Sequence, residues 1–386
     1  MELDFLKPVD SGVLSISKNA LGKTLSEVLF IHMEQGGMPV LDEVKIAILG
    51  VCEGRNSVGN HEAGSSFISI RKHLYSMFPG NWGVKVADIG DVIPGDTVAD
   101  TYFAVQKIIS SLLKKGIIPV IIGGGQELTY INYRAYDALE QTVNLVSVDN
   151  KFNLGEIDKP IDSTSFLSRI IMDTPNNLFN YCNLGYQTFH NSQDEIDLLK
   201  SLYFETHRLG ELLNDIEIVE PVLRDADIVS FDLSAIRNSD APANYNASPN
   251  GLSGMDACAI ARYAGISDKV TSFGIYEFNP LHDTKQITGQ LVAQMIWYFI
   301  EGVNYRANDY PFGILNEYQK YIVPNETETL NFYKSIKSGR WWMEINLNEN
   351  NKFKRHALIP CTYQDYLSAT DQELPERWMN ACKKLA

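Results

Sequence analysis

IIPVIIGGG, residues 117–125, is the stretch that decides the fold. Its first part is apolar without interruption and ends in three glycines. Continuous apolar runs of this length are typical of a strand in a parallel sheet covered by helices on both faces, because a strand with one wet face would alternate apolar and polar residues. The glycines indicate a turn after the strand. No GxGxxG or GK[ST] pattern follows, so this turn does not indicate a nucleotide site.

The same pattern recurs along the chain. Five further short apolar runs, rich in Val and Ile, occupy residues 45–51, 84–90, 143–149, 227–233 and 270–278. Amphipathic stretches accompany them, and we expect helices at 98–115, 129–140, 194–214, 255–265 and 284–302. Strands that alternate with helices in this way indicate an α/β fold with a mainly parallel sheet between layers of helices.

Two segments flank this pattern. We expect residues 1–42 to form a helical extension, with the helix around 18–34. Residues 305–386 read as a C-terminal elaboration with aromatic-rich pieces such as GRWWMEI and YQDYL. Neither an internal repeat nor a low-complexity linker separates these segments from the core at 45–302. We therefore predict a single domain over residues 1–386.

The charge balance excludes some classes of partner. The chain has 33 basic and 48 acidic residues, a formal charge of −15, which repels phosphate backbones and anionic lipid. We therefore expect neither nucleic acid nor a membrane as a partner. No apolar stretch approaches the roughly 20 residues that span a bilayer. The N-terminus, MELDFLKPVDSG, lacks the basic and apolar regions of a signal peptide, so we expect a cytoplasmic protein.

Cysteine and histidine give no sign of a metal site. The five cysteines, at positions 52, 182, 258, 361 and 382, are widely spaced and include no CxxC pair. This pattern suggests neither a disulfide framework nor a thiolate zinc site, and it predicts reduced packing residues. The seven histidines include no HExxH motif and no close pair. Any metal hypothesis must therefore rest on carboxylates.

Polar residues follow four of the predicted strands. Their ends read IIGGGQELTY (121–130), VSVDNKFNLG (146–155), VSFDLSAIRNSDAP (229–242) and GIYEFNPLHD (274–283). In open parallel sheets, ligands bind at the carboxyl ends of the strands, where the loops converge. Taken singly, each segment also fits a structural role, because Asp, Asn and Gln commonly stabilise turns at strand ends.

Taken together, these segments resemble the signatures of the ureohydrolase superfamily, which includes arginase, agmatinase and formimidoylglutamase. The family motifs GGDHS, DAHxD, SxDxDxxDP, PGGLS and ExNPxxD correspond in order to GGGQE, DNKFN, SFDLSAIRNSDAP, PNGLS (249–253) and EFNPLHD (277–283). The resemblance covers residues 45–302 and is closest to formimidoylglutamase. It implies an arginase-like α/β/α fold with a sheet of about eight strands, and a homo-oligomer.

The resemblance also implies a chemistry. Members of this family hydrolyse a guanidino or formimino carbon–nitrogen bond with water bridged between two manganese ions. The positions equivalent to the six metal ligands hold Gln126, Asp149, Lys151, Asn153, Asp232 and Ser234. Asp149 and Asp232 match the bridging carboxylates, and the other four ligands are replaced. The family-equivalent catalytic positions are therefore Asp149, Lys151 and Asp232, and none of them is assigned a catalytic role.

Lys151 is the replacement that brings a positive charge to a metal-ligand position. Two carboxylates at the ends of adjacent strands repel each other unless a cation lies nearby. We therefore interpret the Lys151 ammonium as a stand-in for a metal ion. Four oxygen donors, from Gln126, Asp149, Asn153 and Asp232, leave open a single weak Mn²⁺, Mg²⁺ or Ca²⁺ site, although we expect no tightly bound metal.

Three residues are candidates for substrate binding. Glu277 matches the family carboxylate that faces the guanidinium or formimino group. Asn153 is the second candidate. His61 lies in the loop after the first core strand, where it would carry protons near neutral pH or be an ordinary surface residue. The implied partner is a small cationic or amidine-containing ligand.

Two hypotheses about function follow. The first is a silent or strongly impaired ureohydrolase-fold protein that has lost its binuclear manganese site and retains small-molecule binding. No Ser–His or Cys–His arrangement is evident as a substitute nucleophile. The alternative is an active hydrolase of a formimino or guanidino bond that uses one metal or none. An assembly with an active paralogue is a third, weaker possibility.

Overall fold

The computed structural model describes residues 5–14, 22–311, 315–325, 328–345 and 358–385. The main sheet has ten strands: β1 (Leu6–Lys7), β2 (Phe30–Ile31), β3 (Ile46–Val51), β4 (Val86–Val92), β5 (Ile118–Ile122), β6 (Val143–Val148), β7 (Leu178–Tyr186), β8 (Glu205–Arg208), β9 (Ile228–Asp232) and β10 (Ser272–Tyr276). Their order is β1-β4-β3-β5-β10-β9-β6-β7-β8, and β2 also pairs with β4. All pairs are parallel except β1 with β4.

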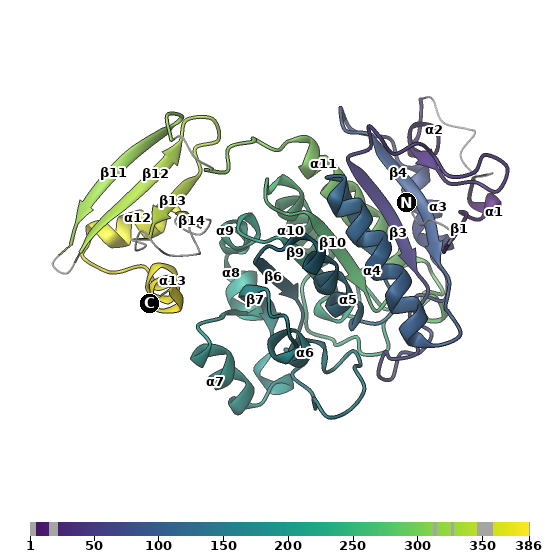
Figure 1. Ribbon diagram of the computed structural model, residues 1–386, viewed down its shortest axis with the longest axis horizontal. Coiled ribbons are helices and arrows are strands. Elements are labelled where there is room, and N and C mark those ends of the chain that lie inside the picture. Colours follow the sequence, from purple (N-terminus) through teal and green to yellow (C-terminus); the bar gives the residue numbers. More distant parts are fainter. Residues whose placement is uncertain (1–4, 15–21, 312–314, 326–327, 346–357, 386) are drawn as a thin grey trace.

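Helices cover both faces of this sheet (Figure 1). The α-helices of the main body are α1 (Ser11–Leu14), α2 (Leu25–Val28), α3 (Ile68–Ser76), α4 (Val98–Lys114), α5 (Leu128–Arg134), α6 (Phe166–Met172), α7 (Gln193–Ser201), α8 (Leu209–Asn214), α9 (Val219–Arg224), α10 (Gly254–Ile266) and α11 (Ile287–Asn304). One buried cluster joins the sheet to α3, α8, α9, α10 and α11, and two others join it to α4, α5, α6 and α7. The predicted three-layer α/β/α fold is thus confirmed.

Several boundaries differ from the sequence prediction. The predicted helix at 194–214 is broken into α7, the edge strand β8 and α8. Strand β7, whose second half is buried, was not predicted, because Asn180 and Asn183 interrupt its apolar run. In the N-terminal extension, residues 15–21 lie outside the described part. The rest of the predicted helix at 18–34 is one turn, α2, followed by strand β2, so that prediction is wrong for the described residues.

The C-terminal segment folds as a second, antiparallel sheet. Its order is β11 (Tyr318–Pro324), β12 (Thr329–Ser335), β13 (Trp341–Glu344) and β14 (Leu358–Cys361), accompanied by α12 (Tyr363–Thr370) and α13 (Glu376–Leu385). It has its own buried cluster, and it lies beside α8 and α9 in Figure 1. Whether 1–386 behaves as one domain stays a prediction. No helix among the described residues is long and apolar enough to cross a membrane.

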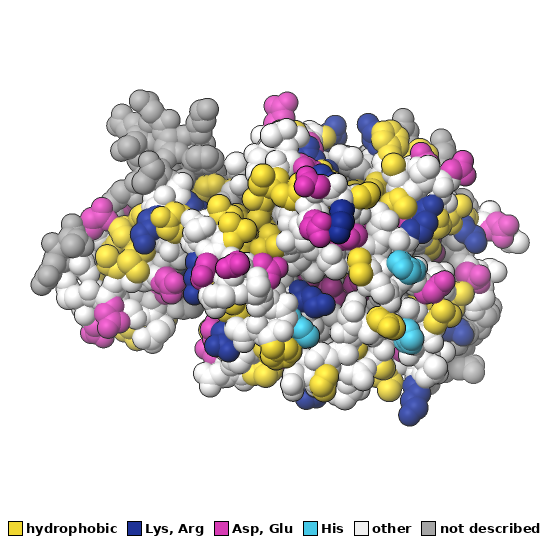
Figure 2. Space-filling model, turned by 90° about the horizontal axis from the view of Figure 1, so that it is seen from below, with side chains coloured by type: hydrophobic (Ala, Val, Ile, Leu, Met, Phe, Trp, Pro, Cys, Tyr) yellow, Lys and Arg dark blue, Asp and Glu magenta, His cyan; other side chains and the backbone are white. Residues whose placement is uncertain are grey.

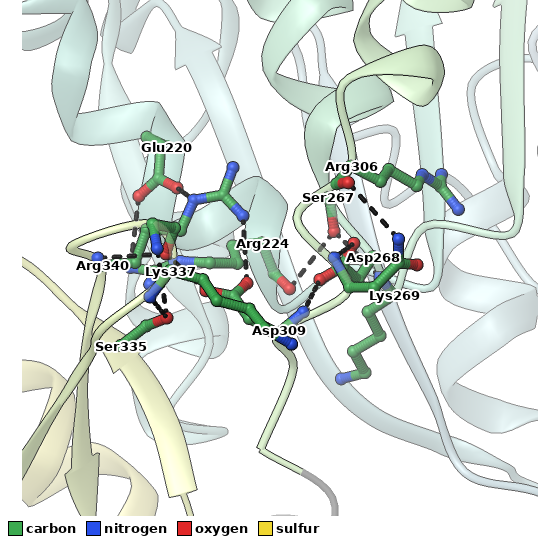
Figure 3. A network of polar contacts seen from close by, with 12 residues as sticks. Glu220, Arg224, Ser267, Asp268, Lys269, Arg306, Asp309, Ser335, Lys337 and Arg340 are labelled. Atoms are coloured by element: carbon green, nitrogen blue, oxygen red, sulfur yellow. Dashed lines mark hydrogen bonds and ion pairs between the residues drawn. The ribbon is translucent and has the colours of Figure 1, made fainter. Parts of the chain in front are cut away.

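A polar network joins the second sheet to the main body (Figure 3). The Asp268 carboxylate accepts hydrogen bonds from the backbone N–H groups of Asn308 (3.1 Å) and Asp309 (2.8 Å), in the segment that follows α11. Arg340, just before β13, places Nη1 3.7 Å from Asp309 Oδ1 and Nε 3.3 Å from Glu220 Oε1. These contacts fix the segment after α11 against both parts of the chain.

Candidate active site at the strand ends

The sheet order brings the four predicted strand ends together. Strands β5, β10, β9 and β6 are consecutive neighbours. Because parallel strands end at the same edge of a sheet, their following residues meet there. We call this group the strand-end site: Gln126, Asp149, Lys151, Asn153, Asp232 and Glu277. All of them are buried except Lys151, which is half-buried.

Both oxygens of the Asp149 carboxylate accept hydrogen bonds from its own loop. The Lys151 backbone N–H donates to Oδ1 at 2.9 Å, and Asn153 Nδ2 donates to Oδ2 at 2.7 Å. Asn153 has a φ of 59°, in the left-handed region that Asn tolerates better than most residues. This tight loop directs the Asn153 amide group at the carboxylate.

Asp232 is held in a similar way at the end of β9. The Ser234 backbone N–H donates to Oδ1 at 2.6 Å, and Asn244 Nδ2 lies 3.5 Å from the same oxygen. Ser234, which stands at a family ligand position, therefore contributes its backbone to the carboxylate. Its own hydroxyl lies 3.4 Å from Asn150 Oδ1, on a neighbouring loop.

Glu277 is the most fully engaged carboxylate of the site. Ser57 Oγ lies 2.8 and 2.7 Å from its two oxygens, and Asn60 Nδ2 donates to Oε2 at 2.7 Å. The Gln126 backbone N–H donates to Oε1 at 2.8 Å. Gln126 turns its side-chain amide elsewhere and donates from Nε2 to Ser230 Oγ at 2.9 Å. Sequence reasoning missed Ser57, because a serine in a polar loop carries no distinctive signal.

Lys151 lies near both aspartates without pairing with either. Among the described residues, no ion pair within 4.0 Å involves its ammonium group. Its positive charge nevertheless offsets part of the rise that burial causes in the pKa of Asp149 and of Asp232. Burial, together with the Lys151 charge, lowers the pKa of His190 on the next loop. His61 is exposed on its loop.

Burial dominates the electrostatics of the three carboxyl groups. It raises the pKa of Asp149 well above its usual range, and the Asp232 carboxylate adds to the rise. Burial likewise raises the pKa of Asp232 to about 6 against the donors around it. Burial and the nearby Asp232 charge raise the pKa of Glu277 to about 7. Binding of a proton or a cation therefore stabilises these buried carboxyl groups near neutral pH.

A further buried carboxyl group, Glu127, was also missed. It occupies the last position of GGGQE, where the family motif has serine, and burial together with the Glu277 charge raises its pKa. Tyr102 OH donates to its Oε1 at 3.2 Å, and its Oε2 has no hydrogen-bond partner in the described structure. The Glu127 side chain turns back over Gly125, where a Cβ atom would overlap the carboxyl group.

Comparison with known proteins identifies the family. The Arginase family profile matches residues 45–301. Formimidoylglutamase of Streptococcus gordonii is 25% identical over 295 residues, which are 70% of this chain and 88% of that protein. The Geobacillus kaustophilus formimidoylglutamase is 30% identical over 230 residues, 55% of this chain and 68% of that protein.

Solved structures show the same fold. Formimidoylglutamase from Bacillus subtilis superposes with a TM-score of 0.67 at 19% identity, over 80% of this chain and 98% of that one. Trypanosoma cruzi formiminoglutamase with Mn²⁺ superposes with a TM-score of 0.62 at 18% identity, over 73% of this chain and 99% of that one. With the profile match across the whole core, these likenesses confirm the resemblance read from the motifs. The chain belongs to the arginase family.

Proposed function

We propose that this chain is a formimidoylglutamase-like protein that has lost the binuclear manganese site and is catalytically silent or strongly impaired. One observation carries the proposal. At 2.7 Å, Asn153 Nδ2 donates a hydrogen bond to Asp149 Oδ2, whereas the family places a metal-binding carboxylate at position 153. An N–H group that donates to this carboxylate competes with a metal ion for the lone pairs of the oxygen. With Lys151 N on Oδ1, each oxygen of Asp149 already accepts one hydrogen bond from the protein.

The donor set as a whole does not fit two divalent cations. Two manganese ions in this family are held by imidazoles and carboxylates, and four of those six positions here hold Gln126, Lys151, Asn153 and Ser234. A protonated lysine has no lone pair to offer a metal, and a neutral amide adds no negative charge. Because affinity for hard cations follows the number of charged oxygen ligands, the loss of two carboxylates weakens such a site strongly.

The remaining polar groups support binding of a small cation. Ser57, Asn60 and the backbone of Gln126 hold the Glu277 carboxylate in one orientation. An amidinium or guanidinium group would donate to such a carboxylate in charge-assisted hydrogen bonds, which are stronger than neutral ones. The bound cation would also offset the repulsion between Glu277 and Asp232. We therefore propose a small amidine-containing ligand, with Glu277 as its anchor.

A second candidate is an active hydrolase with a single metal. It is favoured by Gln126 Oε1, a buried oxygen with no hydrogen-bond partner in the described structure. With Asp232 it offers oxygen donors of the type that Mn²⁺, Mg²⁺ and Ca²⁺ accept. In that case the metal would supply an activated water, and Glu277 would hold the substrate. The homo-oligomer and the cytoplasmic location stay predictions.

Metal analysis and an activity assay separate the two candidates. The protein is expressed with added Mn²⁺, purified without chelator, and analysed for bound metal and for hydrolysis of formimidoylglutamate, arginine and agmatine. We expect far less than one metal ion per chain and no turnover. Stoichiometric manganese together with ordinary turnover would overturn the proposal.

Ligand binding is tested separately by calorimetry with the same three compounds. We expect the Glu277→Gln variant to lose any binding that the wild-type chain shows. The exposed Glu62→Gln serves as a matched control of equal charge change in the same region of the chain. Equal binding by wild type and Glu277→Gln would remove Glu277 from the proposed anchor role.

A further inference from the structure

Three metal-ligating side chains converge away from the strand-end site. Strands β7 and β8 pair in parallel with Cys182 opposite Glu205 and Leu184 opposite His207. Because side chains alternate along a strand, Cys182, Glu205 and His207 share one face of the sheet. The Cys182 sulfur, a Glu205 oxygen and a His207 nitrogen all lie within 4.8 Å of one another. We call these three residues the edge cluster.

The imidazole of His207 lies between two carboxylates. Its Nδ1 lies 3.4 Å from Glu211 Oε2, on the first turn of α8. Its Nε2 lies 3.9 Å from Glu205 Oε2 and is buried without a hydrogen-bond partner in the described structure. When Nδ1 donates to Glu211, the lone pair of Nε2 faces the Glu205 carboxylate. A carboxylate on the far nitrogen fixes the tautomer of metal-binding histidines in this way.

The cluster borders open space on two sides. Cys182 and Glu205 line a cavity of about 30 Å³, which is large enough for a water-sized occupant. Glu205 and His207 also line the groove between the main body and the C-terminal sheet. Acidic side chains gather at this junction (Figure 2). An ion bound here would be reachable from solvent.

We propose that Cys182, Glu205 and His207 form a zinc-binding site with three protein ligands and a fourth position open toward the groove. Sulfur, imidazole nitrogen and carboxylate oxygen together match the preferences of Zn²⁺, and three ligands leave room for water or a ligand. The Cys182 thiol gives its proton to solvent as its sulfur bonds to the metal, so the zinc thiolate forms without a redox change.

Arg377 of α13 is the competing cation. Its Nη2 lies 2.8 Å and its Nε 3.2 Å from Glu205 Oε2. A zinc ion on Glu205 would repel this guanidinium group and weaken its hold. Metal binding at the edge cluster and docking of the C-terminal helix therefore oppose each other.

Sequence reasoning excluded a thiolate site for an identifiable reason. Cys182 is more than twenty positions from Glu205 and His207, and the expected helix at 194–214 hid strand β8. The inference does not rest on the proposed function of the strand-end site, which contains no thiol.

Cobalt is the probe for this site, because a thiolate bound to Co²⁺ gives an ultraviolet charge-transfer band that nitrogen and oxygen ligands do not. The full chain is freed of metal with a chelator and titrated with Co²⁺ and then with Zn²⁺. We expect one Co²⁺ per chain, a thiolate band, and loss of the band when Zn²⁺ displaces the cobalt. Absence of the band overturns the proposal.

Variants assign the ligands. Cys182→Ser abolishes the band. Glu211→Gln weakens binding by about 10- to 100-fold, and His207→Ala, which removes a ligand, weakens it more. Cys258→Ser, at another buried cysteine, leaves the band unchanged. His207 is partly exposed, so its variant tests the site even if the Cys182 variant fails to fold. A band that persists in Cys182→Ser, or full affinity in His207→Ala, contradicts the assignment.

The competition with α13 has its own test. Arg377→Gln removes the guanidinium charge beside Glu205, so it should bind Zn²⁺ more tightly than the wild-type chain. Equal or weaker binding in Arg377→Gln overturns the competition between zinc and α13.

Discussion

The strand-end site and the edge cluster differ in how their lone pairs are used. At the strand-end site, the oxygens of Asp149 and Glu277 accept hydrogen bonds from protein groups that face them. At the edge cluster, Arg377 donates to Glu205 Oε2, but His207 Nε2 is buried without a hydrogen-bond partner in the described structure and lies 3.9 Å from the same oxygen. The first arrangement is closed by hydrogen bonds within the protein, whereas the second leaves one nitrogen for an added cation that would compete with Arg377 for Glu205.

The difference shows that membership of a metal-binding family does not by itself provide metal ligands at the family positions. The residues that correspond to metal ligands by motif include an amide donor and a lysine, whereas a set with the right chemistry for zinc lies at the edge of the same sheet. A hydrogen bond from protein to carboxylate and a metal bond to that carboxylate compete for one lone-pair direction. Four predictions test this contrast, from the largest expected effect to the smallest.

Restoring the family ligands should reopen the strand-end site. The fourfold variant Gln126→His, Lys151→His, Asn153→Asp and Ser234→Asp removes the ammonium and adds two carboxylates and two imidazoles. We expect its Mn²⁺ affinity to exceed that of the wild-type chain by roughly three orders of magnitude, because affinity follows ligand charge. Calorimetric titration with Mn²⁺ measures the gain. An equal affinity in both proteins would show that the ligand positions are not those of the family.

The second prediction concerns pH. The pKa of Asp232 is raised to about 6 and that of Glu277 to about 7, both above their values in an unfolded chain. A raised carboxyl pKa stabilises the folded state below the unfolded value, and this stability is lost as pH rises through the folded value. The free energy of unfolding should therefore fall between pH 4 and pH 7 by on the order of 3 kcal/mol.

Urea denaturation across this range measures the pH effect. The double variant Asp232→Asn and Glu277→Gln keeps the shapes of both side chains and removes their titration. Its stability should change less with pH than that of the wild-type chain. A wild-type stability that rises from pH 4 to pH 7 would contradict the assigned pKa shifts.

The third prediction concerns the cation that now occupies the edge cluster. Arg377 and Glu205 are each less than one-fifth exposed, and Arg377→Ala removes the guanidinium group from the Glu205 carboxylate. We expect a loss of about 2 kcal/mol in the free energy of unfolding, because the Glu205 carboxylate would then be poorly hydrated and would lack its cationic partner. Added Zn²⁺ should recover part of this loss in Arg377→Ala.

An exposed ion pair provides the control for this variant. Lys159 and Glu156 are 64% and 70% exposed, so Lys159→Ala should cost less than about 1 kcal/mol. Thermal unfolding of both variants, with and without Zn²⁺, gives the comparison. Equal losses in Arg377→Ala and Lys159→Ala would mean that the Arg377 pair contributes no more than a surface pair.

The smallest predicted effect distinguishes the contribution of the Asn153 side chain to stability from that of its backbone conformation. Asn153→Ala and Asn153→Gly both lose the hydrogen bond to Asp149, but only alanine is strained at a φ of 59°. We expect alanine to be less stable than glycine by about 1 kcal/mol, measured by urea denaturation. If the two variants are equally stable, the loop relaxes and no longer aims residue 153 at Asp149.

The parallel core was predictable because its signal is local. The apolar runs at β5, β6, β9 and β10 lie within a few residues of the observed strands, and their order along the motifs placed Asp149, Asp232 and Glu277 together. Strands β7 and β8 were not found, because asparagines interrupt the first and the second is only four residues long. The C-terminal sheet was seen only as an aromatic-rich elaboration.

The partners within the site were less predictable than its members. Ser57 and Asn60 reach Glu277 from a loop more than two hundred positions away, so only the folded structure pairs them. The sequence analysis also predicted that the Lys151 charge lies near the aspartates. It did not predict that the backbone N–H of Lys151 donates to Asp149 Oδ1. Charge can be read from residue types, whereas hydrogen-bond direction depends on loop geometry.

The overlap between Gly125 and Glu127 couples these two positions in any attempt to rebuild the family motif. The family motif has a side chain at position 125, and here the Glu127 carboxyl group fills the space where that side chain would begin. A side chain restored at position 125 alone would meet the Glu127 carboxyl group, which would have to turn to another position. Positions 125 and 127 are therefore coupled, and the side chain of the family motif at position 125 fits most easily when residue 127 is as short as the serine of that motif.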